Sequence, residues 1–241
     1  DELEEHYGAY NGLNLMFETR EGILKHCSLN NAKLLGPVAQ RFIDRTQPSL
    51  EAQLTNLADE IAYNSHDIDD GLRAEVFRIE ELADLPLVGN ILREIAAHHP
   101  RLDTSRHAHE LVRRVITRMI EDVIAETKRR AAQIAPSSSD AVREAGRPLV
   151  GFSAAMEEAD KAIKGFLYPK VYRSDRIMAI MTDAEDVVRD LFGYYFAHSS
   201  ELPDEWLASL DPADEAGRAR RVADFIAGMT DRYAMIEHAR L

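Results

Sequence analysis

Apolar residues recur along most of the chain at spacings of three and four, which is the pattern of an amphipathic helix. The strict alternation that marks a half-buried strand is nearly absent, so the sequence predicts an all-α fold. Clusters of glycine, proline and serine separate the periodic runs and indicate where helices end. Helices are expected at residues 13–27, 49–70, 78–84, 86–97, 104–134, 154–165, 174–196, 203–208 and 211–237.

Turn-forming residues indicate how the helices are grouped. The helix expected at 49–70 begins after Pro48-Ser49 and is predicted to stop at Gly71. A surface loop is expected at residues 136–139, where one proline precedes three serines. The stretch from 136 to 148 is the predicted boundary, which divides the chain into residues 1–135 and a C-terminal helical subdomain of residues 136–241. Apolar positions of the 104–134 helix predict its core face: Leu111, Val112, Val115, Ile116, Met119, Ile120, Val123 and Ile124.

Composition and charge narrow the class of protein. With 241 residues and a net charge of −13, the chain would repel nucleic acid, and a phosphorylated substrate would need a bound cation and a local basic cluster. No apolar run is long enough to span a membrane, and Asp1-Glu2 does not open a secretory signal. The single cysteine, Cys27, cannot form an internal disulfide, so we expect a reducing, cytoplasmic location.

An acidic stretch at residues 59–70 is the main candidate for chemistry. It contains five carboxylates and no basic residue, although surface helices usually mix the two charges. Asp59, Tyr63 and Asp67 are spaced i, i+4 and i+8, so on a helix they align along one face, opposite Ile61 and Ile68. This face is either simply solvated or a covered surface that holds a cation.

Four segments, in the same order, resemble the bacterial dGTPase-like deoxynucleoside triphosphate triphosphohydrolases of the HD-domain superfamily, and together they extend over essentially the whole chain. Residues 58–71 resemble that family's ADDIAYxxHDxxDG segment. Residues 12–26, which include Lys25 and His26, resemble GLNLTxExxxGxxKH. Residues 166–173 resemble FLYxxVYR, and residues 225–234 resemble YIAGMTDRYA.

The resemblance implies a fold, a reaction and a metal. The fold would be an HD-domain-like helical bundle with an additional C-terminal helical region, in which residues 1–135 are the C-terminal part of the catalytic core. The family converts a deoxynucleoside triphosphate to the deoxynucleoside and tripolyphosphate. It uses a divalent ion such as Mg²⁺ or Mn²⁺, held by a His, a His-Asp pair and an Asp. A homo-oligomer is also implied.

The same resemblance assigns roles to individual residues. Asp59 matches the last metal ligand, and Tyr63 and Asp67 match residues that contact the sugar and phosphates. His66-Asp67 is not the family's His-Asp pair, because it follows Asp59 in the matched segment. The chain is therefore expected to carry one metal ligand and part of an active site, with no catalytic residue identified.

Other basic and aromatic residues have two interpretations each. Lys25 and His26 either border the substrate pocket or interact with a helix C-terminus. Arg113 has apolar neighbours and needs an anionic partner, for which a carboxylate is favoured over a phosphate. Tyr172 and Arg173 either contact substrate or combine packing with a solvated basic tip.

Two other functions stay open. One is an HD-type nucleotidase or phosphodiesterase that uses the same metal. The other is a catalytically silent, nucleotide-sensing helical assembly module.

Overall fold

The computed structural model describes residues 8–9, 13–24, 27–207 and 214–241, so Lys25 and His26 lie outside the described residues. Within these ranges every regular element is helical and no strand occurs, which confirms the all-α prediction. None of the helices described is long and apolar enough to cross a bilayer. The chain forms two compact units, Asp1–Val171 and Tyr172–Leu241.

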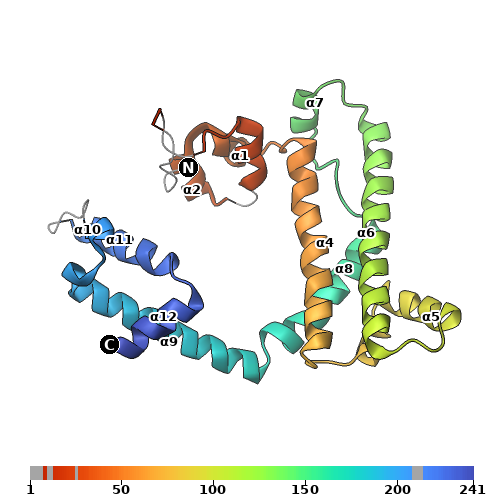
Figure 1. Ribbon diagram of the computed structural model, residues 1–241. Helices are drawn as coiled ribbons and strands as arrows, with labels where there is room; N and C mark the ends of the chain where they lie inside the picture. Colours follow the sequence, from red (N-terminus) through yellow and green to blue (C-terminus); the bar gives the residue numbers. More distant parts are fainter. Residues whose placement is uncertain (1–7, 10–12, 25–26, 208–213) are drawn as a thin grey trace. The chain divides into compact units, whose positions relative to one another are not determined.

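The first unit is built on a pair of long helices. Figure 1 shows α4 and α6 side by side, and they run in opposite directions. Side-chain caps fix where both begin, since Ser49 accepts from the Ala52 amide and Asp103 accepts from the Arg106 amide. The elements are α1 (Phe17–Ile23), α2 (Leu29–Leu35), η1 (Gly36–Ala39), α3 (Gln40–Asp44), α4 (Leu50–Arg73), η2 (Ile79–Leu82), α5 (Val88–His98), α6 (Thr104–Ile134), α7 (Ser139–Arg143) and α8 (Ala154–Leu167).

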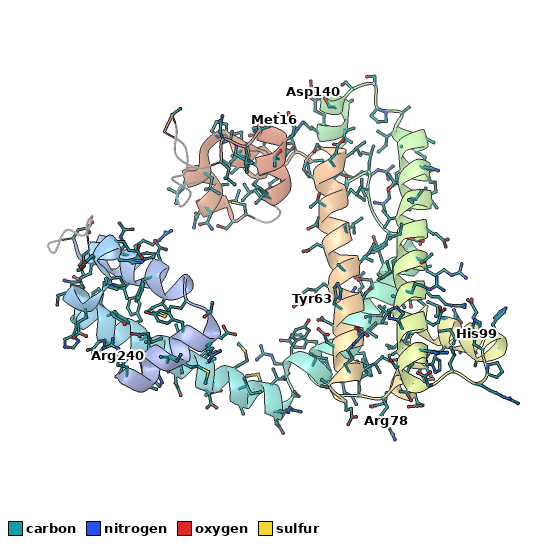
Figure 2. All side chains as sticks on the ribbon, viewed as in Figure 1. Met16, Tyr63, Arg78, His99, Asp140 and Arg240 are labelled. Carbon is teal, nitrogen blue, oxygen red and sulfur yellow. The ribbon has the colours of Figure 1, made fainter. Side chains whose placement is uncertain are left out.

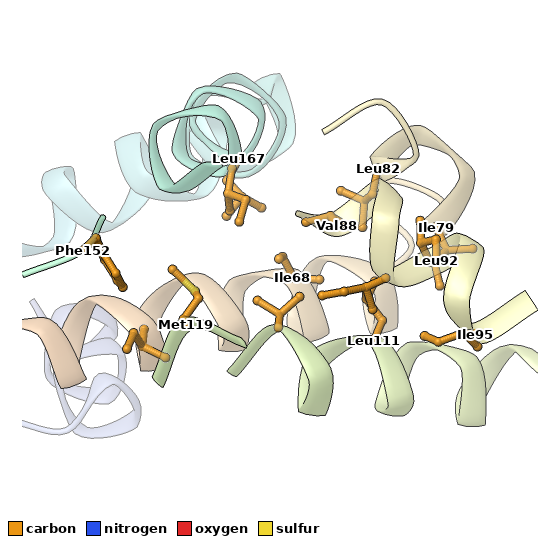
Figure 3. Packing of buried hydrophobic residues seen from close by; sticks show 14 of the residues in the cluster. Ile68, Ile79, Leu82, Val88, Leu92, Ile95, Leu111, Met119, Phe152 and Leu167 are labelled. Atoms are coloured by element: carbon orange, nitrogen blue, oxygen red, sulfur yellow. The ribbon is translucent and has the colours of Figure 1, made fainter. Parts of the chain in front are cut away.

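Buried side chains of α4, α5, α6 and α8 form one hydrophobic core (Figure 3). Ile68 of α4 and Met119 of α6 are fully buried there, and each such side chain stabilises the fold by about 1.5–3 kcal/mol. The predicted core face of α6 is confirmed at every fourth residue from 111 to 123, all of which are buried. Val112 and Ile116 are partly buried and pack against this core, whereas Ile120 and Ile124 are 44% and 49% exposed, so the predicted core face is wrong at these last two positions.

Gly71 does not end α4, which continues to Arg73, so the predicted stop is wrong. The glycine is instead required by packing. A Cβ atom at this position would lie 2.2 Å from the ring of Phe77, which is itself buried. The absence of a side chain at Gly71 lets the segment after α4 fold back closely against the helix.

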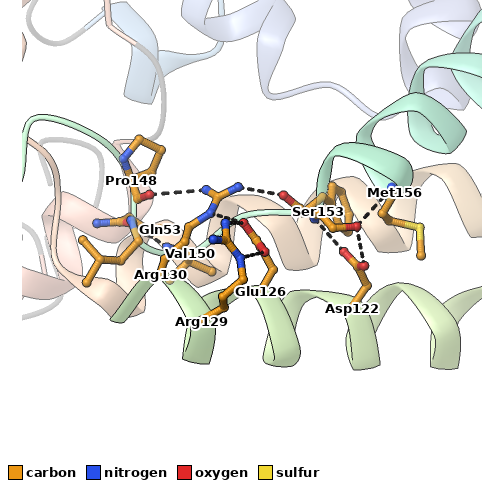
Figure 4. A network of polar contacts seen from close by, with 11 residues as sticks. Gln53, Asp122, Glu126, Arg129, Arg130, Pro148, Val150, Ser153 and Met156 are labelled. Carbon is orange, nitrogen blue, oxygen red and sulfur yellow. Dashed lines mark hydrogen bonds and ion pairs between the residues drawn. The ribbon is translucent and has the colours of Figure 1, made fainter. Parts of the chain in front are cut away.

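A polar network fastens the segment before α8 to α4 and α6 (Figure 4). The Gln53 side-chain oxygen accepts hydrogen bonds from the amides of Leu149 and Val150, at 2.8 and 3.0 Å. Arg130 of α6 donates to the carbonyl oxygens of Pro148 and Phe152. These bonds join residues 148–152 to α4 and α6, so the chain beyond residue 135 still belongs to the first unit. The two compact units divide after residue 171, and the boundary predicted after residue 135 does not coincide with that division.

The second unit packs around a smaller core. It contains α9 (Asp175–Ala197), η4 (Ser199–Glu201), α10 (Asp204–Leu207), α11 (Glu215–Ala227) and α12 (Asp231–Arg240). Leu191 and Tyr195 of α9 are buried against Val222 and Phe225 of α11. The single helix predicted at 211–237 is wrong, since the described part of that range is divided between α11 and α12. The break arises because the Thr230 hydroxyl accepts from the Tyr233 amide and so starts a new helix.

Candidate functional site

Asp59, Tyr63 and Asp67 align along α4 on the side opposite its core residues, as their spacing predicts. Ile61 and Ile68 are buried, whereas Asp59 is exposed, Tyr63 is 58% exposed and Asp67 is half-buried. Tyr63 is labelled near the middle of α4 in Figure 2. The three side chains therefore form an acidic stripe with one aromatic ring, which we call the α4 stripe.

Bonds between α4 and α8 fix the rotation of the α4 stripe. The Asn64 amide donates to the Asp160 carboxylate at 2.6 Å, and both residues are buried. Lys164 of α8 donates to Asp160 at 2.8 Å and to Glu60 at 3.2 Å. Glu60 and Asn64 each follow a stripe residue, so they lie about 100° further around the helix. Anchoring that side to α8 therefore sets the direction in which Asp59 and Tyr63 point.

Little in the sequence indicates this positioning network. Asp160 lies 96 residues from Asn64, and only the tertiary structure brings the two together. Burial lowers the pKa of Lys164, but hydrogen bonds to Asp160 and Glu60 outweigh it and raise that pKa above its usual value. The ammonium group stays charged at neutral pH, so its single positive charge offsets part of the negative charge of Asp160 and Glu60 beside the α4 stripe.

The residues described do not by themselves make a metal site. Among them, no group of three or more His, Cys, Asp or Glu side chains is placed to hold an ion. Asp59 can offer a carboxylate oxygen, which is a ligand that Mg²⁺ and Mn²⁺ accept, but those ions need several ligands. Its predicted role as one ligand of a larger set stays a prediction.

Arg113 lies on the surface and not among apolar neighbours. Its side chain is 57% exposed and pairs with Glu110 at 2.8 Å, so the anionic partner is a carboxylate, as favoured from the sequence. Hydrogen bonds from Arg113 and Arg114 lower the pKa of Glu110 to about 2. Arg114 also reaches Glu94 of α5 at 3.6 Å. These pairs account for the charge of Arg113, while its substrate contact stays a prediction.

Tyr172 and Arg173 open the second unit. Tyr172 ends a five-residue π-helical turn, η3 (Tyr168–Tyr172), a rare geometry that is frequent at functional sites. The Arg173 guanidinium lies 3.9 Å from the sulfur of Met178, and the Ser174 hydroxyl caps α9. The predicted contact of Tyr172 and Arg173 with substrate stays a prediction.

Two cavities of the first unit adjoin other sides of α4. One of 730 Å³ lies at the end of the helix and includes Asp69, Arg73 and Thr104 in its lining. Another of 440 Å³ includes Gln53, Glu60 and Asp160. The lining of neither cavity includes a residue of the α4 stripe.

Comparison with known proteins identifies relatives along the whole chain. The profile of the phosphohydrolase-associated domain matches residues 150–240. A deoxyguanosinetriphosphate triphosphohydrolase-like protein of Bordetella pertussis is 48% identical over 241 residues, which are 100% of this chain and 62% of that protein. A protein of the same name from Ralstonia nicotianae is 48% identical and is covered over 61% of its length. The corresponding protein 1 of Mesorhizobium japonicum is 46% identical, with 99% of this chain and 62% of that protein aligned.

These matches confirm the resemblance indicated by the four sequence segments. The chain spans about three fifths of the length of these curated relatives, with 62% of the Bordetella pertussis protein covered. Along its entire length the chain is therefore homologous to deoxyguanosinetriphosphate triphosphohydrolase-like proteins, and its residues 150–240 are similar to the phosphohydrolase-associated domain.

Proposed function

We propose that the protein containing this chain hydrolyses deoxynucleoside triphosphates, dGTP or several of them, to the deoxynucleoside and tripolyphosphate. The α4 stripe carries the proposal, because Asp59, Tyr63 and Asp67 present two carboxylates and a ring on a helix face held in register by α8. The names of the relatives, which are 46–48% identical over 99–100% of the chain, favour the same reaction.

In the proposed reaction water adds across the bond between the 5′ oxygen and the α-phosphorus. The water oxygen stays on the tripolyphosphate, and the 5′ oxygen takes a proton and leaves as the deoxynucleoside hydroxyl. Tyr63 and Asp67 would contact the sugar and phosphates, and Asp67 would accept a hydrogen bond from the 3′ hydroxyl of the deoxyribose. Turnover is expected to depend on Mg²⁺ or Mn²⁺, with Asp59 as one of the ligands.

The test uses the complete product of the gene that encodes this chain. Each of the four deoxynucleoside triphosphates is supplied with Mg²⁺ or Mn²⁺, and the products are separated by ion chromatography. We expect tripolyphosphate and the deoxynucleoside in equal amounts. Orthophosphate or a nucleoside monophosphate would instead show a nucleotidase or phosphodiesterase. Binding of nucleotide without any product would show a silent sensing module.

A matched pair of variants tests Asp59. Asp59→Ala should reduce turnover to background and keep the helical circular dichroism spectrum, because the side chain is exposed and packs in no core. Glu51→Ala removes the same charge from an exposed position two turns earlier on α4 and should keep normal turnover. Normal turnover by the Asp59 variant would refute the role proposed for this carboxylate.

A further inference from the structure

The 730 Å³ cavity at the end of α4 combines a fixed apolar floor with charged sides. Phe77 and Ile79 line it, and because they are 3% and 9% exposed, close packing holds their side chains in place. Leu72 of α4 and Ala108 of α6 also line it and are half-buried. The volume lies in the range of cavities that bind small molecules. No residue of the α4 stripe lines this cavity, so it is a separate candidate site, which we call the α4-end cavity.

Charges of both signs line the α4-end cavity. Asp69 and Arg73 pair with each other at 2.7 Å, so these two charges offset one another. The side chains of Glu75, Arg78 and Glu80 line the cavity as well, and within the described part of the chain none of the three forms an ion pair. The cavity therefore offers one guanidinium and two carboxylates to a ligand.

The guanidinium of Arg78 is available although a further carboxylate, that of Glu81, is close in sequence. Glu81 accepts a hydrogen bond from the Arg78 backbone amide at 2.8 Å and pairs with Lys170 at 2.5 Å. Lys170 thus meets the charge of Glu81. A guanidinium has five N–H donors and forms strong hydrogen bonds with carboxylates, so Arg78 is suited to bind the carboxylate of a ligand.

Glu75 occupies a backbone position that favours glycine. At the end of α4 the Val76 amide donates to the Gly71 carbonyl at 2.9 Å, and the Glu75 amide donates to the Leu72 carbonyl at 3.3 Å. These two bonds form a Schellman motif, in which the residue after the cap is left-handed and usually glycine. Glu75 has a φ of 54°, which strains any residue that carries a side chain. The fold gains nothing from the Glu75 side chain, which points to a use in the cavity.

We propose that the α4-end cavity binds a small zwitterion with an apolar side chain, such as a free apolar amino acid. Its carboxylate would pair with Arg78 and its ammonium group with Glu75. Its side chain would cover the floor at Phe77 and Ile79. A simple anion would meet the carboxylates of Glu75 and Glu80, and a simple cation would meet Arg78, so the two signs together select a ligand that carries both.

Isothermal titration calorimetry of the complete product of the gene tests the proposal, with L-phenylalanine and L-leucine as probes. Two analogues of L-phenylalanine each lack one charge, since phenethylamine has no carboxylate and 3-phenylpropionate has no ammonium group. We expect saturable binding of an amino acid and at least about tenfold weaker binding of both analogues. Absence of binding by both amino acids, or an analogue that binds as tightly as L-phenylalanine, overturns the proposal.

Glu75→Gly separates binding from folding. The midpoint of urea unfolding should rise, because glycine adopts the left-handed conformation without strain, whereas the dissociation constant for L-phenylalanine should rise by at least about tenfold. Arg45→Gly is the matched control, because Arg45 is exposed and left-handed at the end of α3, with a φ of 57°. It should raise the midpoint and leave the dissociation constant unchanged. Unchanged binding by Glu75→Gly would refute the proposed pairing of Glu75 with the ammonium group.

Arg78→Gln identifies the partner of the ligand carboxylate. The dissociation constant for L-phenylalanine should rise by about tenfold, whereas the weaker binding of phenethylamine, which has no carboxylate, should stay the same. An equal loss for both compounds would show that Arg78 acts on the cavity as a whole and would refute its pairing with the carboxylate. Circular dichroism of every variant checks that the helices are kept.

Discussion

Gln53 offers the sharpest test of how the first unit is held together. Its side chain is 6% exposed and its oxygen accepts from two backbone amides at 2.8 and 3.0 Å. Its nitrogen donates to the Pro48 carbonyl at 2.9 Å. Gln53→Met keeps the length of the side chain and removes all three hydrogen bonds. The amides of Leu149 and Val150 are then buried without an acceptor.

The expected loss of stability follows from those two amides. Each unsatisfied buried donor costs about 1–3 kcal/mol, so the variant should lose about 2–6 kcal/mol of its free energy of unfolding. If that free energy falls by about 2 kcal/mol per molar urea, the unfolding midpoint should fall by about 1–3 M. Far-ultraviolet circular dichroism measures the unfolding midpoint. In hydrogen exchange, the backbone amides of Leu149 and Val150 should exchange faster in the variant than in the unchanged chain.

The control makes the same substitution at an exposed glutamine. Gln133→Met on α6 changes the same atoms but breaks no buried hydrogen bond, and it should leave the midpoint within experimental error. Trp206, the single tryptophan, is partly buried and packs against the core of the second unit, so its fluorescence follows that unit separately. If Gln53→Met and Gln133→Met unfold at the same urea concentration, the three bonds of Gln53 do not stabilise the fold.

Two further variants probe carboxylates on α6, of which Glu126 is buried and Asp122 is half-buried. Hydrogen bonds from Arg129 and Arg130 lower the pKa of Glu126 from 4.5 to about 2. The ionised carboxylate therefore contributes its full stabilisation above pH 4.5, and this contribution is lost as the pH falls towards 2. The free energy of unfolding of Glu126→Gln, measured with urea, should therefore decline less steeply between pH 4.5 and 2 than that of the unchanged chain. An equal decline in the two proteins would contradict this. Asp122→Ala removes two bonds to Ser153, at 2.8 and 2.6 Å, and should cost about 1–3 kcal/mol in urea unfolding. Exposed Glu121→Ala should cost much less, and equal losses in the two variants would show that the bonds between Asp122 and Ser153 do not stabilise the fold.

Local features of the sequence were enough to place the long helices. The helix predicted at residues 104–134 has the observed bounds of α6, because Asp103 caps it and Pro136 follows it closely. The division of α4 into an apolar face and the acidic stripe also followed from the 100° rotation per residue. Such features depend on neighbours within one or two turns, which the sequence displays directly.

Tertiary packing decided everything that joins distant residues. Asn64 and Asp160, and Gln53 and Leu149, meet across 96 positions, and no local pattern distinguishes these partners from other polar residues. Gly71 was predicted as a helix end from local preference, but contact with Phe77 requires it inside the helix. The free energy of packing depends on which surfaces meet in space. The contacts between distant residues and the bounds of the compact units could therefore be seen only in the tertiary structure.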